Sequence, residues 1–111
     1  MKYNSIINFN VNEIPVTFEV KLGNSIFLMG INYNEQYDYF SVDLFNIRKE
    51  PIVLSEKLIL NQPLFEGLID SRLPAPTIIP SDSSGLENRV KKANFGKTVF
   101  IYIDDGEDIN G

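Results

Sequence analysis

The chain has 111 residues and a net charge of −5 at neutral pH, with 43% hydrophobic and 23% charged residues. This length supports one hydrophobic core and not two, and the composition excludes a wholly disordered chain. The acidic charge repels phosphate and anionic lipid, so neither nucleic acid nor a membrane surface is expected as a partner.

The amino terminus predicts no targeting segment. Met1 to Ser5 leads into an alternating polar and apolar stretch that lacks the continuous apolar run of a signal peptide. No run approaches the roughly 20 apolar residues that a membrane span needs. Cysteine is absent, which excludes a disulfide framework. We therefore expect a soluble protein that is made, and left, in a cytoplasm.

The first half of the chain predicts three strands of a meander. Polar and apolar residues alternate from Pro15 to Leu22, the period of a half-buried strand. The apolar run Ser25 to Tyr33 begins directly after Gly23-Asn24, which favours a hairpin. After a polar, turn-prone stretch, Tyr37 to Phe45 alternates again and predicts the third strand.

The middle of the chain predicts shorter elements. Pro51 to Leu54 and Lys57 to Leu60 read as two short extended pieces, and both suit a sheet edge, the first because a proline cannot donate to a ladder. Between Asn61 and Arg72, apolar residues recur at helical spacing. Pro63 and Gly67 limit this segment to a helical turn or two.

The last third predicts an extended path, a loop and a final strand. Leu73 to Pro80 contains three prolines and leads into a strand. Ser81 to Gly85 has the composition of a loop, and Leu86 to Lys92 predicts a solvated helical turn. Lys97 to Ile103 is apolar on both faces, as expected of a central strand.

Together these elements predict an all-β fold. Residues 1–103 form the single β domain, and residues 104–111 form a short acidic tail. We expect a small meander of about six to eight short strands with one or two helical turns. Closure into a barrel and closure into a sandwich both fit this pattern.

The residue types leave little room for catalysis or metal binding. Histidine is absent, which excludes Ser-His-Asp triads and imidazole metal sites. Carboxylates such as Asp38 and Asp43 could serve glycoside hydrolysis, but solvated surface charge is the commoner explanation. Asp104 to Asp108 lacks the spacing of a calcium loop, and Gly96-Lys97-Thr98 lacks the first glycine of a phosphate loop. We expect no enzyme activity, catalytic residue, metal or cofactor.

Two surface features leave binding functions open. A basic group before the final strand is explained by a solvated loop face, although it would also suit an acidic partner; it comprises Arg89, Lys91, Lys92 and Lys97. The aromatic residues around the third strand mostly suit core packing of a β domain. They also allow an alternative function, a small carbohydrate- or ligand-binding module that uses an aromatic face.

Four groups of segments in this chain share their order and spacing with one known family. They are the hairpin Val16–Asn24, Ile31–Asn34 followed by Tyr39–Phe45, Pro51–Leu54 followed by Leu58–Phe65, and the closing segment Asn94–Ile103. In this order they resemble the baseplate plug family of contractile-tailed bacteriophages and prophages. The resemblance implies a structural subunit of the virion tail baseplate, in its axial hub region and assembled in the host cytoplasm. It implies contacts with hub and tail-tube proteins and no catalytic residues.

A subunit that acts by assembly needs exposed anchors. Specific interfaces bury about 800 Å² per partner around a few aromatic or arginine side chains. The candidate anchors are Tyr37, Tyr39, Phe45 and Arg72. The loop Ser81 to Asn94 is expected to become ordered on assembly. Association into a homo-oligomer is left open by the sequence.

Overall fold

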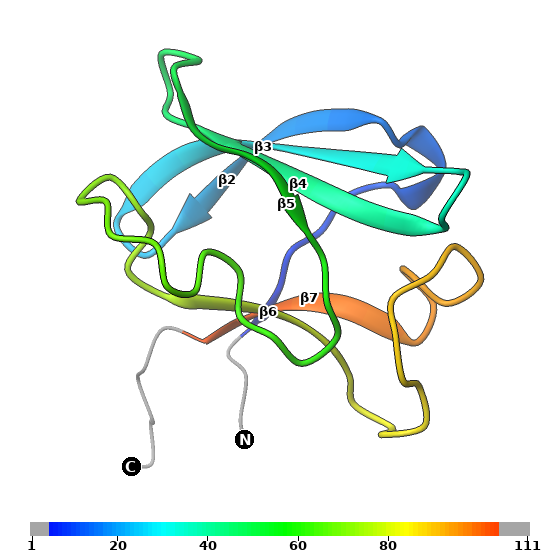
Figure 1. The fold of residues 1–111 in the computed structure, drawn as a ribbon. Helices are drawn as coiled ribbons and strands as arrows, with labels where there is room; N and C mark the ends of the chain where they lie inside the picture. Colours follow the sequence, from blue (N-terminus) through cyan, green and yellow to red (C-terminus); the bar gives the residue numbers. More distant parts are fainter. Residues whose placement is uncertain (1–4, 105–111) are drawn as a thin grey trace, which may run out of the picture.

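A computed structural model describes residues 5–104. Within this range seven strands and one 3₁₀ helix form two antiparallel sheets, which pack as a sandwich and do not close into a barrel (Figure 1). The elements are β1 (Ser5–Ile6), η1 (Val11–Glu13), β2 (Val16–Leu22), β3 (Ser25–Asn34), β4 (Tyr39–Phe45), β5 (Pro51–Lys57), β6 (Thr77–Asp82) and β7 (Val99–Asp104). The all-β prediction is confirmed, and of its two closures the chain adopts the sandwich. Residues 105–111, which hold most of the expected acidic tail, lie outside the described range.

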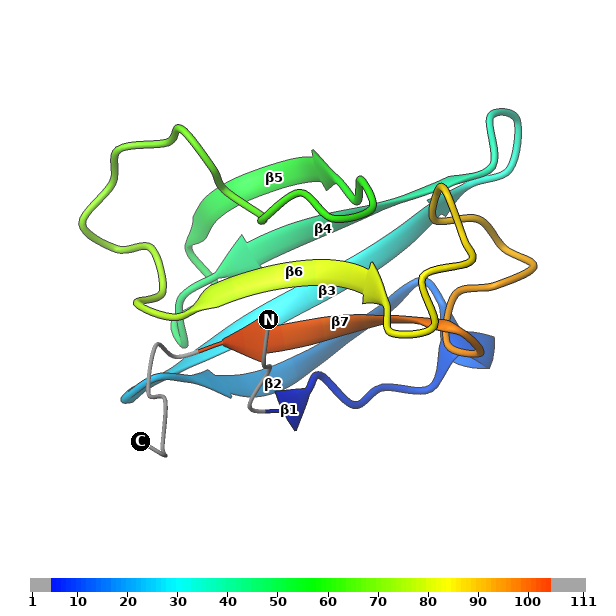
Figure 2. The ribbon, with the colours of Figure 1, turned by 90° about the horizontal axis from the view of Figure 1, so that it is seen from below.

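The two sheets differ in size and in how they are assembled. One sheet has the order β2-β3-β4-β5, so it is a meander of consecutive strands. The other has the order β1-β7-β6, which places β7 in its centre as expected. Figure 1 shows the sheets one above the other, and Figure 2 shows the three-stranded sheet in front, with β1 and β2 along the same side of the sandwich.

The predicted hairpin at the start of the meander is confirmed. Leu22 pairs with Ser25 across the two-residue turn Gly23-Asn24. Gly23 has a φ of +68°, a conformation that favours glycine and matches the twist of a tight hairpin. The third strand begins at Tyr39, two residues later than expected, because Asp38 has a positive φ and belongs to the β3–β4 turn.

The core lies between the inner faces of the sheets. Because successive side chains of a strand point to opposite faces, every second residue of each sheet places a large apolar side chain in the interior. The fully buried ones include Met29, Ile31, Val42, Leu44, Ile78, Val99 and Ile101. At one end the rings of Phe40 and Phe95 lie 4.5 Å apart, centroid to centroid, and Phe9 lies 5.4 Å from Phe95. The core therefore extends from the strands into the loop that precedes β7.

Part of the middle of the chain was predicted wrongly. The first expected extended piece, Pro51–Leu54, lies within the longer strand β5 at a sheet edge, as expected. The second, Lys57–Leu60, forms no strand beyond Lys57. After β5, the amide of Leu58 donates to the carbonyl of Phe40 at 2.9 Å, and the chain turns away from the sheet. No helical turn forms between Asn61 and Arg72, because Phe65 and Gly67 have positive φ.

Two further local differences concern the carboxyl-terminal half and the segment before β2. Ser81 and Asp82, expected in a loop, end strand β6. The segment Leu86–Lys92 is irregular and not helical, because the Asp82 carboxylate accepts hydrogen bonds from the amides of Leu86 and Glu87. Conversely, η1 was not expected. Its first turn is capped by the Asn10 side chain, which accepts a hydrogen bond from the amide of Asn12.

The central position of Ile101 predicts its contribution to stability. Ile101→Val removes one methylene from a fully buried site and should lower the free energy of unfolding by about 0.5–1.5 kcal/mol. Ile69→Val makes the same chemical change at a residue that is 101% exposed, and it should change stability by less than about 0.5 kcal/mol. Urea denaturation of both variants measures the difference, and equal effects would contradict this placement of the core.

Candidate interaction surfaces

The four predicted anchors lie at two different ends of the sandwich. Tyr37, which is 67% exposed, and Tyr39 lie at the β3–β4 turn. Phe45 lies at the other end of β4, where it pairs with Pro51. The Arg72 guanidinium also lies at this end of β4: its Nη1 atom is 3.4 Å from the carbonyl oxygen of Pro51. The structure therefore forms two pairs of anchors and not one cluster.

The end that carries Phe45 and Arg72 contains a groove of about 430 Å³, which we call the turn-end groove. The β2–β3 turn, the β4–β5 turn and the segment 71–75 line it, and Figure 1 shows both turns projecting at the left. Ile26 and Ile47 line the groove and are 47% and 59% exposed. This end is therefore an apolar concave surface with a cation at its rim.

Arg72 is fixed by its neighbours. Its Nη2 and Nε atoms donate to the two carboxylate oxygens of Asp70, at 2.7 and 3.0 Å. This bidentate pair, with a further bond from the Arg72 amide, lowers the pKa of Asp70 to about 2. The same hydrogen bonds to Asp70 raise the pKa of Arg72. The guanidinium thus fastens the segment 70–72 to β5, while half of its side chain stays exposed.

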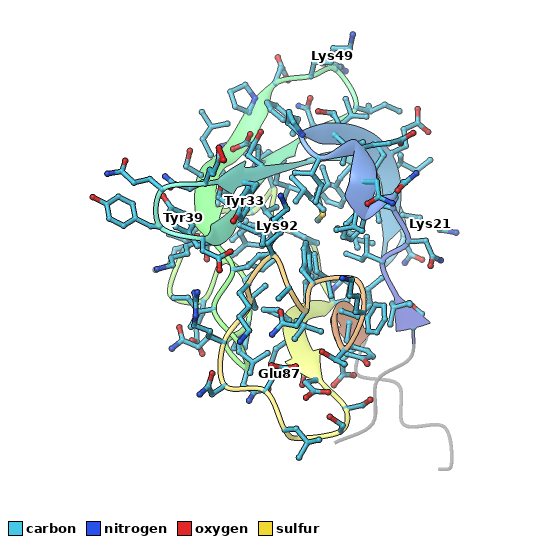
Figure 3. All side chains as sticks on the ribbon, turned by 90° about the vertical axis from the view of Figure 1, so that its right-hand side faces the viewer. Lys21, Tyr33, Tyr39, Lys49, Glu87 and Lys92 are labelled. Atoms are coloured by element: carbon cyan, nitrogen blue, oxygen red, sulfur yellow. The ribbon has the colours of Figure 1, made fainter. Side chains whose placement is uncertain are left out.

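The opposite end contains a larger groove of about 720 Å³, which we call the aromatic–lysine groove. It lies between η1, the β3–β4 turn and the segment 92–97, and its lining includes Tyr33, Phe40 and Phe95. The ammonium group of Lys92 lies 5.7 Å from the centre of the Tyr33 ring. Figure 3, which views this end of the molecule, shows the two residues next to each other. Phe40 and Phe95 are buried at its base, so the groove combines the Tyr33 ring with a cation held over it.

Glycine is required where the groove's loop packs against η1. Gly96 has a φ of +81°, and a Cβ atom there would lie 3.2 Å from the Cβ of Val11. A side chain at this position would both strain the backbone and crowd Val11. The close approach of segment 92–97 to η1, and so the shape of the groove, depends on this glycine.

Asp38 joins the β3–β4 turn to the distant loop between β6 and β7. Its carboxylate accepts hydrogen bonds from the Lys92 amide at 2.9 Å, the Tyr33 hydroxyl at 2.8 Å and Arg89 Nη2 at 3.0 Å. These bonds stabilise the charged form and lower the pKa of Asp38, with the Lys92 amide as the largest cause. The bond to Asp38 in turn raises the pKa of Tyr33.

The β6–β7 loop also has hydrogen bonds of its own. The Asp82 carboxylate accepts from the hydroxyl and amide of Ser84, and the Ser84 hydroxyl is the largest cause of its lowered pKa. The buried Asn94 side chain donates to Glu87 Oε1 and to the carbonyl of Arg89, each at 2.9 Å. The loop that was expected to become ordered on assembly thus already has an internal framework.

The carboxylates considered for catalysis serve separate structural roles. Asp43 accepts from the Asn32 side chain at 3.0 Å and from the Ser55 amide at 2.7 Å, where β5 bulges. Asp38 binds a different set of groups at the β3–β4 turn. Among residues 5–104 no group of three or more acidic side chains is arranged to hold a metal ion.

Sequence reasoning did not identify Asp38 as a structural centre. A turn-forming aspartate between two strands gives a signal for local capping. Its partners Arg89 and Lys92 lie more than 50 residues away, at separations of 51 and 54. No periodicity links such positions, so this contact could be found only in three dimensions.

The Asp38 contacts predict a pH-dependent contribution to stability. Asp38→Asn keeps the side-chain shape and tolerates a positive φ, but it removes the charge that these donors stabilise. At pH 7 it should lower the free energy of unfolding by on the order of 1 kcal/mol. Because the folded pKa is lowered, this contribution is complete above the unfolded pKa of about 3.9 and is lost as the pH falls through the folded pKa.

Urea denaturation of the wild type and Asp38→Asn at pH 7 and at pH 2 measures this difference. The gap between the two proteins should shrink toward zero in acid. A gap of the same size at both pH values would show that the charge of Asp38 does not contribute.

Comparison with known proteins identifies the family. A family model described as "Cyanophage baseplate Pam3 plug gp18" matches residues 5–107. No curated protein and no solved structure matches the chain with significant similarity. Within residues 5–104, no helix has the length and apolar character needed to cross a membrane. The family match covers both sheets and both grooves, and it confirms the resemblance drawn from the order of segments: this chain belongs to the cyanophage baseplate plug family.

Proposed function

We propose that this protein is a structural subunit in the plug or hub region of a phage or prophage tail baseplate, where it acts by protein–protein assembly. The observation that carries the proposal is the family match, which spans residues 5–107 and so covers the whole sandwich. Its partners are other baseplate, hub and tail-tube proteins. Its location is the virion tail, after assembly in the cytoplasm of the host.

The turn-end groove is the surface best suited to such a contact. Specific interfaces have an apolar centre and a polar rim. Here Ile26 and Ile47 provide exposed apolar surface beside the half-exposed Arg72. Because Asp70 and Pro51 already hold the guanidinium, little side-chain entropy is lost when a partner packs against it. We propose Phe45 and Arg72 as anchors at this end.

Tyr37 and Tyr39 are proposed as anchors of a second, smaller contact at the opposite end. Tyr37 is highly exposed, and the ammonium group of Lys57 lies 4.8 Å from the centre of the Tyr39 ring. Contacts at opposite ends of one sandwich let the subunit bridge two neighbours. A plug that lies between a hub and a tube needs such an arrangement.

The aromatic residues do not form the sugar-stacking face that the alternative function needs. Phe40 is buried in the core, and the Tyr33 hydroxyl is bonded to Asp38. Phe45 lies at the far end of β4 from Tyr37 and Tyr39. No observation favours carbohydrate binding over assembly, and we propose one function.

Deletion of the gene from the phage or prophage tests this function directly. Without the protein, particles should lack a complete baseplate in negative-stain electron microscopy, and supply of the wild-type protein in trans should restore it. The wild-type protein should also co-purify with intact tails. Normal tails after deletion would overturn the proposal.

Ile47→Lys tests the turn-end groove. The substitution places a charge on an apolar surface that a partner would desolvate, so incorporation into tails should fall at least about ten-fold. Leu86→Lys makes a matched change at a residue that is 87% exposed in the β6–β7 loop, and it should assemble normally. Quantitative blotting of purified tails measures both, and circular dichroism verifies that both variants fold. Equal incorporation of the two variants would show that the groove is not the contact.

A further inference from the structure

Among the described residues, the outer edge of β2, unlike the other sheet edges, is a regular strand edge with unpaired backbone groups. Leu22 and Ser25 close a two-residue hairpin, so Leu22 and every second residue before it bond to β3. The amides and carbonyls of Thr17, Glu19 and Lys21 therefore point away from the sheet. These three residues are exposed, and within residues 5–104 their backbone groups have no hydrogen-bond partner.

The remaining edges are short, covered or irregular. In the part of the chain that the structure describes, β1 comprises Ser5 and Ile6. Along β6, the amides of Asn61 and Leu64 donate to the carbonyls of Pro80 and Ile78, each at 2.7 Å, and Pro80 has no amide hydrogen to offer. β5 begins with a proline and contains a bulge with Ser55 at a φ of +60°. Such features prevent pairing with another strand, whereas β2 is a regular strand of seven residues.

The charges on β2 specify what can pair with it. Glu19 and Lys21 are two positions apart, so their side chains extend from the same outer face of the sheet. Figure 3 shows Lys21 pointing away from the core at this side of the molecule. If a second β2 runs antiparallel to the first about a two-fold axis at Val20, Glu19 lies opposite Lys21 of the other copy, and Lys21 lies opposite its Glu19.

We propose that the outer edge of β2 pairs antiparallel with β2 of a second copy of this chain, centred on Val20. Each Glu19–Lys21 pair then exchanges backbone hydrogen bonds and brings opposite charges side by side. The two-fold axis repeats these contacts, so the interface is self-complementary. The two four-stranded sheets become one continuous sheet. This pairing goes beyond the baseplate role and does not depend on it.

A charge swap tests the pairing. Sedimentation equilibrium of the full wild-type chain over a concentration series should show a monomer–dimer equilibrium. Lys21→Glu places Glu19 opposite another glutamate in both pairs and should raise the dissociation constant at least about ten-fold. The double variant Glu19→Lys/Lys21→Glu restores opposite charges and should bring the constant back to within about three-fold of the wild type.

Three results would overturn the proposal. The wild type could stay monomeric at millimolar concentration, which would show that β2 does not pair with a second copy and that any strand pairing with it belongs to a different protein. The charge swap could fail to restore the dimer although thermal melting shows that it is folded. Hydrogen exchange could find the Glu19 and Lys21 amides equally fast in monomer and dimer, which would place the contact elsewhere. Because Ile47 lines the turn-end groove and does not lie on the β2 edge, tail incorporation of Ile47→Lys remains an independent test of the proposed function.

Discussion

The contact between Phe40 and Phe95 ties the sandwich together at one end. Phe40 belongs to the four-stranded sheet, while Phe95 precedes the central strand of the other sheet, and their ring centroids lie 4.5 Å apart. Burial of two aromatic rings at this point stabilises the sheets against each other and holds the segment before β7 in place. The aromatic–lysine groove, the Asp38 contacts and the position of Gly96 against Val11 all depend on this arrangement.

Alternation along the chain predicted most of the strands because a sandwich buries one face of each sheet. Periodicity failed between Asn61 and Arg72, where the helical spacing of Leu64, Phe65, Leu68 and Ile69 predicted a helical turn or two. Leu64 and Phe65 are buried, but Leu68 is 47% exposed and Ile69 fully exposed, so these residues share no face. The segment instead follows the edge of β6, to which Leu64 donates a hydrogen bond. Pairing of this kind depends on a strand that lies later in the chain, and local spacing does not encode it.

The candidate anchors illustrate the same limit. Alternation along β4 places Tyr39 and Phe45 on one face of the strand. A strand rises about 3.3 Å per residue, so two residues six positions apart are separated by about 20 Å and belong to different ends of the molecule. Arg72 joins Phe45 only because the long segment after β5 returns to Pro51. Residue type suggested which side chains could anchor a partner, whereas their grouping into two surfaces required the fold.

The two proposed contacts are compatible because they involve different surfaces of the molecule: one is at the end of the four-stranded sheet, and the other is along its β2 edge. The turn-end groove lies beyond the end of β2, whereas the β2 edge lies along its length. In an antiparallel pair centred on Val20 the two β2–β3 turns point in opposite directions, and each turn lies beside Thr17 of the other copy. The dimer therefore presents its two turn-end grooves on opposite sides of the two-fold axis. Lys21 pairs with Ile26, which lines the groove, so the charged edge adjoins the apolar surface without covering it. An assembly with this geometry would hold two partners apart at a distance fixed by the register of the paired β2 strands, which is a mechanical role that needs no catalytic group.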